Sequence, residues 1–201
     1  MTHTFDYFAS MTREPFLFYE MRGTARLLLE GLTDKEIIAE VIRDNLYQYP
    51  TERSLKKVAS CCLRRLHALG DRALIEILAT YPVEEAKQVC LYAMMKQDRL
   101  VWEFMVSVIG AKNLAGERNF SKMDLNVFFM QLQEQNDTIA KWSDATIQKL
   151  KQVLLKTLVE CDYLDSTKSE ILNPIYLYPA LENGIRSNGD DIVLPVFHCF
   201  A

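Results

Sequence analysis

Glycine is scarce in this sequence, with seven residues in a chain of 201. The glycines are scattered singly, so we expect no glycine-rich loop that could wrap a phosphate, and no nucleotide hydrolase. Histidine is scarcer still: His3, His67 and His198 are the only three, and none has metal-ligand spacing with a cysteine or a carboxylate. We therefore expect a protein that is not an enzyme and that binds neither a metal nor another cofactor.

Long apolar runs are missing as well. The most apolar stretch, residues 100–111, is interrupted by Glu103, whereas a membrane-spanning helix needs about 20 consecutive apolar residues. The first ten residues lack the basic segment and apolar run of a secretory signal. The five cysteines are an odd set without the spacing of a disulfide framework. We expect a cytoplasmic protein with reduced, mostly buried cysteines and no membrane contact.

What the sequence does contain is positive charge gathered in two short blocks. The formal net charge of the chain is -4, yet residues 51–72 hold six Lys or Arg against two Asp or Glu. Residues 141–156 hold four against one, and every other part of the chain is net acidic. Charges in salt solution act over about 10 Å, so a polyanion would respond to these blocks rather than to the mean charge.

The first basic block belongs to a predicted pair of helices. Thr33 can cap the first helix in a capping box with Glu36. The polar turn NLYQYP follows, and the second helix runs from Thr51 to Leu69, where Gly70 stops it. A short helix, a turn and a longer basic helix form the arrangement of a helix-turn-helix, whose second helix enters the major groove of DNA.

The second helix of this pair separates apolar from basic residues. Its buried stripe is predicted from spacings of three and four, and comprises Leu55, Val58, Ala59, Cys62, Leu66 and Leu69. The opposite face carries the predicted DNA contacts Arg53, Lys56, Lys57, Ser60 and Arg64. The alternative is that this charge only keeps an ordinary helix solvated.

The second basic block predicts another amphipathic helix. Ser143 or Asp144 can cap it, and its buried stripe comprises Ile147, Leu150, Leu154, Leu158 and Cys161. The lysines predicted to extend the DNA contact are Lys141, Lys149, Lys151 and Lys156. Beyond this helix, two apolar runs enclose the turn-forming residues SNGDD, which predicts a short β-hairpin. A helix pair followed by a hairpin is typical of a winged helix.

These patterns predict a mainly α protein of two small helical modules. Residues 1–115 would form the first module, with the helix-turn-helix-like unit. Residues 116–201 would form the second, with the winged-helix-like unit and its C-terminal β-hairpin. The boundary is placed in the segment GAKNLAGERNFSK, residues 110–122. The apolar helices between the two units are predicted to be scaffold.

Residues 10–69 resemble the opening of the BrxA family, small proteins encoded in BREX phage-defence clusters. The resemblance rests on a helix before the turn Glu30–Gly31, an "-EI" helix, a short connector and a basic helix ending in Arg-Leu. KQDRLVWEF at 96–104 and WSDATIQKLKQVLLKTLVECDYL at 142–164 are also similar to that family. The resemblance implies a helical protein that binds double-stranded DNA without catalysis, beside the methyltransferase and ATPase of the system. A likeness of the family to the antitermination factor NusB implies that RNA is a further possible ligand.

Together these observations predict a non-enzymatic, double-stranded DNA-binding accessory protein of a BREX-type bacteriophage defence system. Because its basic residues are mostly lysines, we expect weak sequence preference and strong salt dependence. One alternative is a protein–protein adaptor that docks onto larger defence components, which the acidic majority of the chain and its final residues VFHCFA would suit. The other is an RNA-binding factor, although the basic helix holds no Phe, Tyr or Trp for base stacking.

Overall fold

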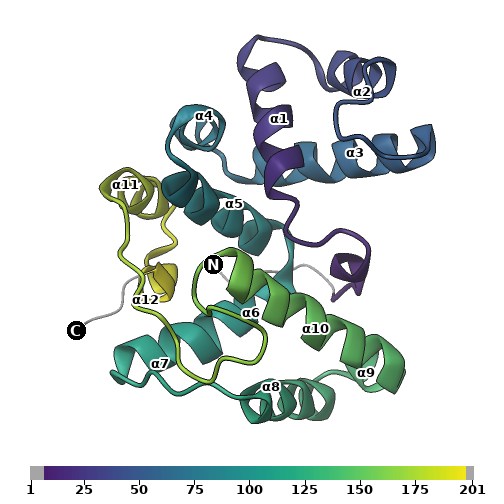
Figure 1. The fold of residues 1–201 in the computed structure, drawn as a ribbon. Coiled ribbons are helices and arrows are strands. Elements are labelled where there is room, and N and C mark those ends of the chain that lie inside the picture. Colours follow the sequence, from purple (N-terminus) through teal and green to yellow (C-terminus); the bar gives the residue numbers. More distant parts are fainter. Residues whose placement is uncertain (1–6, 198–201) are drawn as a thin grey trace. The chain divides into compact units, whose positions relative to one another are not determined.

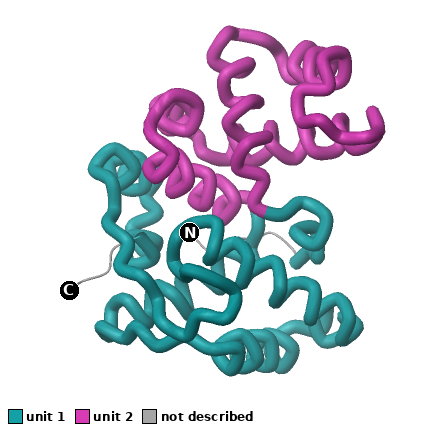
Figure 2. Tube along the Cα trace, viewed as in Figure 1, with its two compact units in different colours: residues 1–15, 98–201 teal, residues 16–97 magenta. Residues whose placement is uncertain are grey.

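The computed structural model describes residues 7–197 and is built from helices (Figure 1). The described residues contain no strand, only an isolated bridge between Asn119 and Ile171. The predicted mainly α class is therefore confirmed. The chain divides into two compact units (Figure 2): residues 16–97 form unit 2, and residues 98–197 with 7–15 form the described part of unit 1.

Unit 2 is a group of five helices in which α1 contacts all four of the others. The helices are α1 (Phe18–Leu29), α2 (Asp34–Arg43), α3 (Glu52–Ala68), α4 (Arg72–Thr80) and α5 (Val83–Gln97). Helix α3 packs against α1, α2 and α5, and α1 also packs against α4. The core between α2 and α3 is formed by Ile37, Val41, Leu55, Ala59 and Leu63. Every residue predicted for the buried stripe of α3 is buried.

Local sequence signals fix the ends of α2 and α3. The predicted capping box is present: the Thr33 amide donates to Glu36 Oε2 at 2.8 Å, and the Glu36 amide donates to Thr33 Oγ1 at 3.4 Å. Thr51 caps α3 by accepting from the Ser54 amide at 3.2 Å. After α3, Gly70 has φ 70°, a left-handed conformation that glycine adopts without strain.

The connection between α2 and α3 does not support a helix-turn-helix. Such a motif joins its helices by about three or four residues, but here residues 44–51 intervene. Asn45 and Gln48 in this connection have left-handed φ angles of 46° and 57°, and the Tyr49 amide donates to Asn45 Oδ1 at 3.0 Å. The sequence predicted both helices but not the folded loop between them.

Unit 1 is also helical among its described residues. Its elements are η1 (Ser10–Thr12), α6 (Arg99–Phe104), the π-helical η2 (Met105–Gly110), α7 (Ala111–Leu114), α8 (Lys122–Gln135), α9 (Asp137–Ala140), α10 (Asp144–Glu160), α11 (Pro179–Ser187), η3 (Asp191–Val193) and α12 (Leu194–Phe197). Ser143 caps α10, and the predicted apolar stripe of this helix is buried. Asn113 donates to the carbonyls of Pro195 and Val196 at 2.8 and 3.2 Å, so α12 is tied to α7.

The predicted C-terminal β-hairpin, and with it the winged helix, is wrong. The first apolar run forms α11, which starts at Pro179 and buries Leu181, Gly184 and Ile185. These positions have the spacing of one helix face, and short apolar runs fit a helix and a strand equally well. The SNGDD segment ends α11, since Gly189 has φ 71°, and the second run forms η3 and α12.

The predicted module boundary after residue 115 remains a prediction. It falls inside unit 1, whereas the two compact units divide between Gln97 and Asp98. Residues beside the predicted boundary bond to the segment after α10: the Phe120 amide donates to the Glu170 carbonyl at 2.9 Å, and the Leu172 amide donates to the Arg118 carbonyl at 2.7 Å.

Asp124 links two helices of unit 1 and gives a testable stability effect. Its Oδ2 accepts from the Ser121 amide at 2.7 Å in the capping box of α8, and its Oδ1 pairs with Lys112 Nζ at 2.9 Å. Burial alone would raise the pKa of Asp124, but the hydrogen bonds from Lys112 and Ser121 outweigh it and lower the pKa.

We expect Asp124→Ala to lower the free energy of unfolding by about 2 kcal/mol at neutral pH, because both the cap and the ion pair are lost. A carboxylate with a lowered pKa stabilises the fold above its unfolded pKa, and this contribution disappears as the pH falls through the folded pKa. Thermal melts should therefore separate the variant from the wild type at neutral pH and converge in acid. Asp137→Ala, at the exposed start of α9, is the matched control; an equal loss in both variants would contradict this role for Asp124.

Candidate nucleic-acid interface

The outward side of α3 is a narrow strip of basic residues. Packing against α1, α2 and α5 buries the opposite side of the helix, including Leu55, Leu63 and Leu66. Arg53, Lys56, Lys57 and Arg64 are exposed and Ser60 is half-buried, so the structure places all five predicted residues of α3 on one side. We call these five residues the basic stripe. At 1.5 Å per residue, it is about 16 Å long.

Like charges are neighbours along the basic stripe. Arg53 lies one helical turn from both Lys56 and Lys57, and like-charged pairs at this spacing destabilise a helix by about 0.3 kcal/mol each. Neither Arg53 nor Lys56 has an ion-pair partner within residues 7–197. The Ser60 hydroxyl donates to the Lys56 carbonyl at 2.8 Å. A bound polyanion would offset the repulsion that these side chains experience in the unbound protein.

Two basic residues beside the stripe have structural contacts. His67 Nε2 lies 2.9 Å from Asp34 Oδ1, which joins the end of α3 to the start of α2. Arg65 is buried, and its Nη1 donates to the Phe16 carbonyl at 3.1 Å. The stripe therefore ends before His67 and excludes Arg65.

The second basic block does not form one face. Lys149 and Lys156 are exposed two turns apart on α10, and Lys141 is exposed after α9. Lys151 is half-buried: its Nζ donates to Asn126 Oδ1 at 2.9 Å and lies 5.6 Å from the ring centroid of Phe129. The predicted contacts of this block thus divide into three exposed lysines and one that is held against α8.

Lys151 lines a groove of about 330 Å³ between α8 and α10. The polar residues of this groove are Lys122, Asn126, Gln148, Lys151 and Gln152. Sequence analysis missed Lys122 and the amides as candidates. The i, i+4 spacing of these residues on α8 and on α10 can be seen in the sequence. The sequence does not show that these faces of the two helices lie against each other.

Three further observations on the described part of the chain bear on function. No group of three or more His, Cys, Asp or Glu side chains within residues 7–197 could hold a metal ion. Cys61, Cys62, Cys90 and Cys161 are buried thiols, and burial raises the pKa of Cys62 well above its usual value. Cys199 lies outside the described residues. No helix in the described range is long and apolar enough to cross a membrane.

Comparison with known proteins decides the family. The model of the BrxA family matches residues 6–189 of this sequence. The chain belongs to the BrxA family. A relative from Bacillus cereus, named BREX protein BrxA, is 36% identical over 192 residues, covering 94% of this chain and 95% of its own length. The resemblance found in the sequence is thereby confirmed.

Two more distant matches cover nearly the same length. The BREX protein BrxA of Escherichia coli is 22% identical over 90% of this chain and 85% of its own length. A crystal structure of an uncharacterized protein from Magnetospirillum magneticum matches with a TM-score of 0.81 at 20% identity, covering 96% of this chain and 99% of that one. At this level of identity the match shows a shared fold alone.

Proposed function

We propose that this BrxA protein is a non-enzymatic, double-stranded DNA-binding component of a BREX-type phage-defence system. The observation that carries the proposal is the basic stripe of α3, whose cations Arg53 and Lys56 have no acidic partner among residues 7–197. Packing of α3 against α1, α2 and α5 holds the helix backbone that carries the stripe in place before DNA binds. Relatives named BREX protein BrxA support the assignment to that system.

The composition of the stripe favours contacts to phosphates over contacts to bases. Lysine binds phosphate as a point charge, whereas base recognition relies on bidentate Arg, Asn or Gln contacts. The stripe has no Asn or Gln, and Arg53 and Arg64 are its two residues with a planar guanidinium group that matches guanine. We therefore propose weak sequence preference, with the exposed Lys141, Lys149 and Lys156 of unit 1 as further phosphate contacts. Lys151 would contact DNA from the groove between α8 and α10.

Salt dependence of duplex binding tests this proposal. The four cations on the stripe, neutralising about four phosphates, alone give a slope of about -4 in a plot of log affinity against log salt concentration, and contacts by the lysines of unit 1 make it steeper. The measurement is fluorescence anisotropy of a labelled random-sequence duplex from low to physiological salt. An RNA hairpin of equal charge is the control for the NusB-like alternative. Tighter binding to RNA, or duplex affinity independent of salt, would contradict the proposal.

A further inference from the structure

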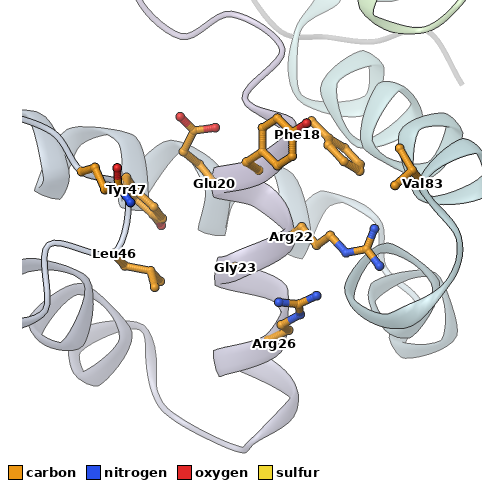
Figure 3. A pocket seen from close by; sticks show the side chains of 10 residues that line it. Phe18, Glu20, Arg22, Gly23, Arg26, Leu46, Tyr47 and Val83 are labelled. Atoms are coloured by element: carbon orange, nitrogen blue, oxygen red, sulfur yellow. The ribbon is translucent and has the colours of Figure 1, made fainter.

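Unit 2 carries a second surface feature, a cleft of about 530 Å³ that crosses α1 (Figure 3). Its floor lies at Gly23, one wall is the loop at Leu46, Tyr47 and Gln48, and the other wall includes Val83 at the start of α5. A Cβ added at Gly23 would meet Leu46 Cδ2 at 3.5 Å, an ordinary contact distance. The absence of a side chain at Gly23 keeps the floor of the cleft open.

Two arginines line this cleft with part of their hydrogen-bonding capacity unused. Arg22 Nη2 donates to the Tyr81 carbonyl at 2.6 Å, and Arg26 Nε donates to the Ala79 carbonyl at 3.2 Å. Both carbonyls lie at the end of α4, so the two guanidinium groups are anchored. The terminal nitrogens of Arg26 bond to no residue between 7 and 197. Figure 3 shows both guanidinium groups on the same side of α1.

The cleft is positively charged. Glu20 is the one acidic residue that lines it, and Glu20 Oε1 accepts a hydrogen bond from the Tyr49 hydroxyl at 2.6 Å. With two arginines against one carboxylate that is already bonded, the lining complements an anionic group. Anchored guanidinium groups suit a carboxylate well, because they bind its two oxygens in a planar, bidentate geometry.

The edges of the cleft are apolar and exposed. Leu46 is 44% exposed, Val83 is 43% exposed and Tyr19 is 82% exposed. Exposed apolar side chains bordered by polar groups mark an interaction site, and Tyr and Arg are, with Trp, the residues enriched at binding hot spots. Phosphate binding would use the arginines but would leave Leu46 and Val83 without a role.

We infer that this cleft docks an acidic segment of a protein partner, with a carboxylate at Arg22 and Arg26 and apolar side chains beside Leu46 and Val83. This surface is separate from the basic stripe: it lies on α1, the 46–48 loop and α5, and shares no residue with the stripe. It would let one chain bind DNA through α3 and a protein through α1.

A random twelve-residue peptide library displayed on phage, selected on the immobilised full chain, tests the inference. The expected winners contain Asp or Glu flanked by Leu, Ile or Phe, and compete with one another for one site. Synthetic winners should bind Leu46→Glu and Val83→Glu at least tenfold more weakly than wild type, because each change places a carboxylate at the edge of the cleft. Both positions are exposed, so the fold should tolerate the changes. Ile192→Glu in unit 1, at a position 63% exposed, is the control and should bind normally.

Three results would overturn the inference. If the selected peptides lacked acidic residues, the arginines would not be binding a carboxylate. If the peptides bound both cleft variants and the control with equal affinity, the binding site would lie outside the cleft. The third result is a loss of duplex DNA affinity in Leu46→Glu and Val83→Glu with no loss of peptide binding. That result would assign the cleft to the nucleic-acid surface.

Discussion

Replacing Arg53, Lys56 and Lys57 of α3 with glutamate should reduce affinity for a random-sequence duplex about a hundredfold or more at low salt. These three side chains are exposed at the start of α3. Contacts between such cations and the phosphates of a nucleic acid supply most of the non-specific binding energy. Reversing them removes these contacts and adds repulsion. Because each position is exposed, the melting temperature and helical content should stay close to those of the wild type.

A charge-matched variant separates local from global electrostatics. Arg13, Lys35 and Lys168 are exposed cations outside both basic blocks, and reversing them changes the formal net charge by the same amount. This control should keep most of the duplex affinity. Equal losses in the two variants, measured by fluorescence anisotropy, would show that overall charge rather than the basic stripe determines binding.

Substituting Arg65 with alanine should cost about 3 kcal/mol of stability. Arg65 is 3% exposed, and its Nη1 donates to the carbonyl of buried Phe16 at 3.1 Å. Truncation leaves a cavity and deprives the Phe16 carbonyl of its charged hydrogen-bond donor, and both effects lower stability. Urea unfolding followed by circular dichroism would measure the loss.

Arg53→Ala is the matched control, because it removes the same side chain from an exposed position in the same helix. It should change the free energy of unfolding by no more than about 0.5 kcal/mol. If Arg65→Ala were as stable as Arg53→Ala, the buried hydrogen bond to Phe16 would not be a structural contact, and Arg65 would have to be considered with the basic stripe.

The ends of α2 and α3 could be predicted because their signals are local. Thr33 with Glu36, Thr51 and Gly70 each act on backbone groups within a few residues, so the sequence contains the whole interaction. The basic stripe could be predicted for a similar reason. Once the apolar positions of α3 fix its buried side, the helical period places the remaining residues opposite.

Features that depend on packing between elements could not be predicted. Arg64 and Arg65 are adjacent in the sequence, yet Arg64 is exposed and Arg65 is buried against a carbonyl that lies 49 residues earlier. Lys151 was predicted as a DNA contact on charge alone, and its bond to Asn126 depends on the contact of α10 with α8. The cleft on α1 likewise needs three separate segments. The hairpin was wrong because its apolar residues fit both helical and strand periods.

Amide chemical-shift mapping tests most directly whether α3 holds duplex DNA. The measurement is a titration of ¹⁵N-labelled protein with a random-sequence duplex at low salt. We predict that the largest shift changes occur between residues 52 and 64, with smaller changes around Lys149 and Lys156 and none at the cleft residues Gly23 and Val83. The assignment of the basic stripe to DNA would be contradicted if the titration reached saturation without shifting the amide signals of α3. The largest shift changes would then lie on other helices.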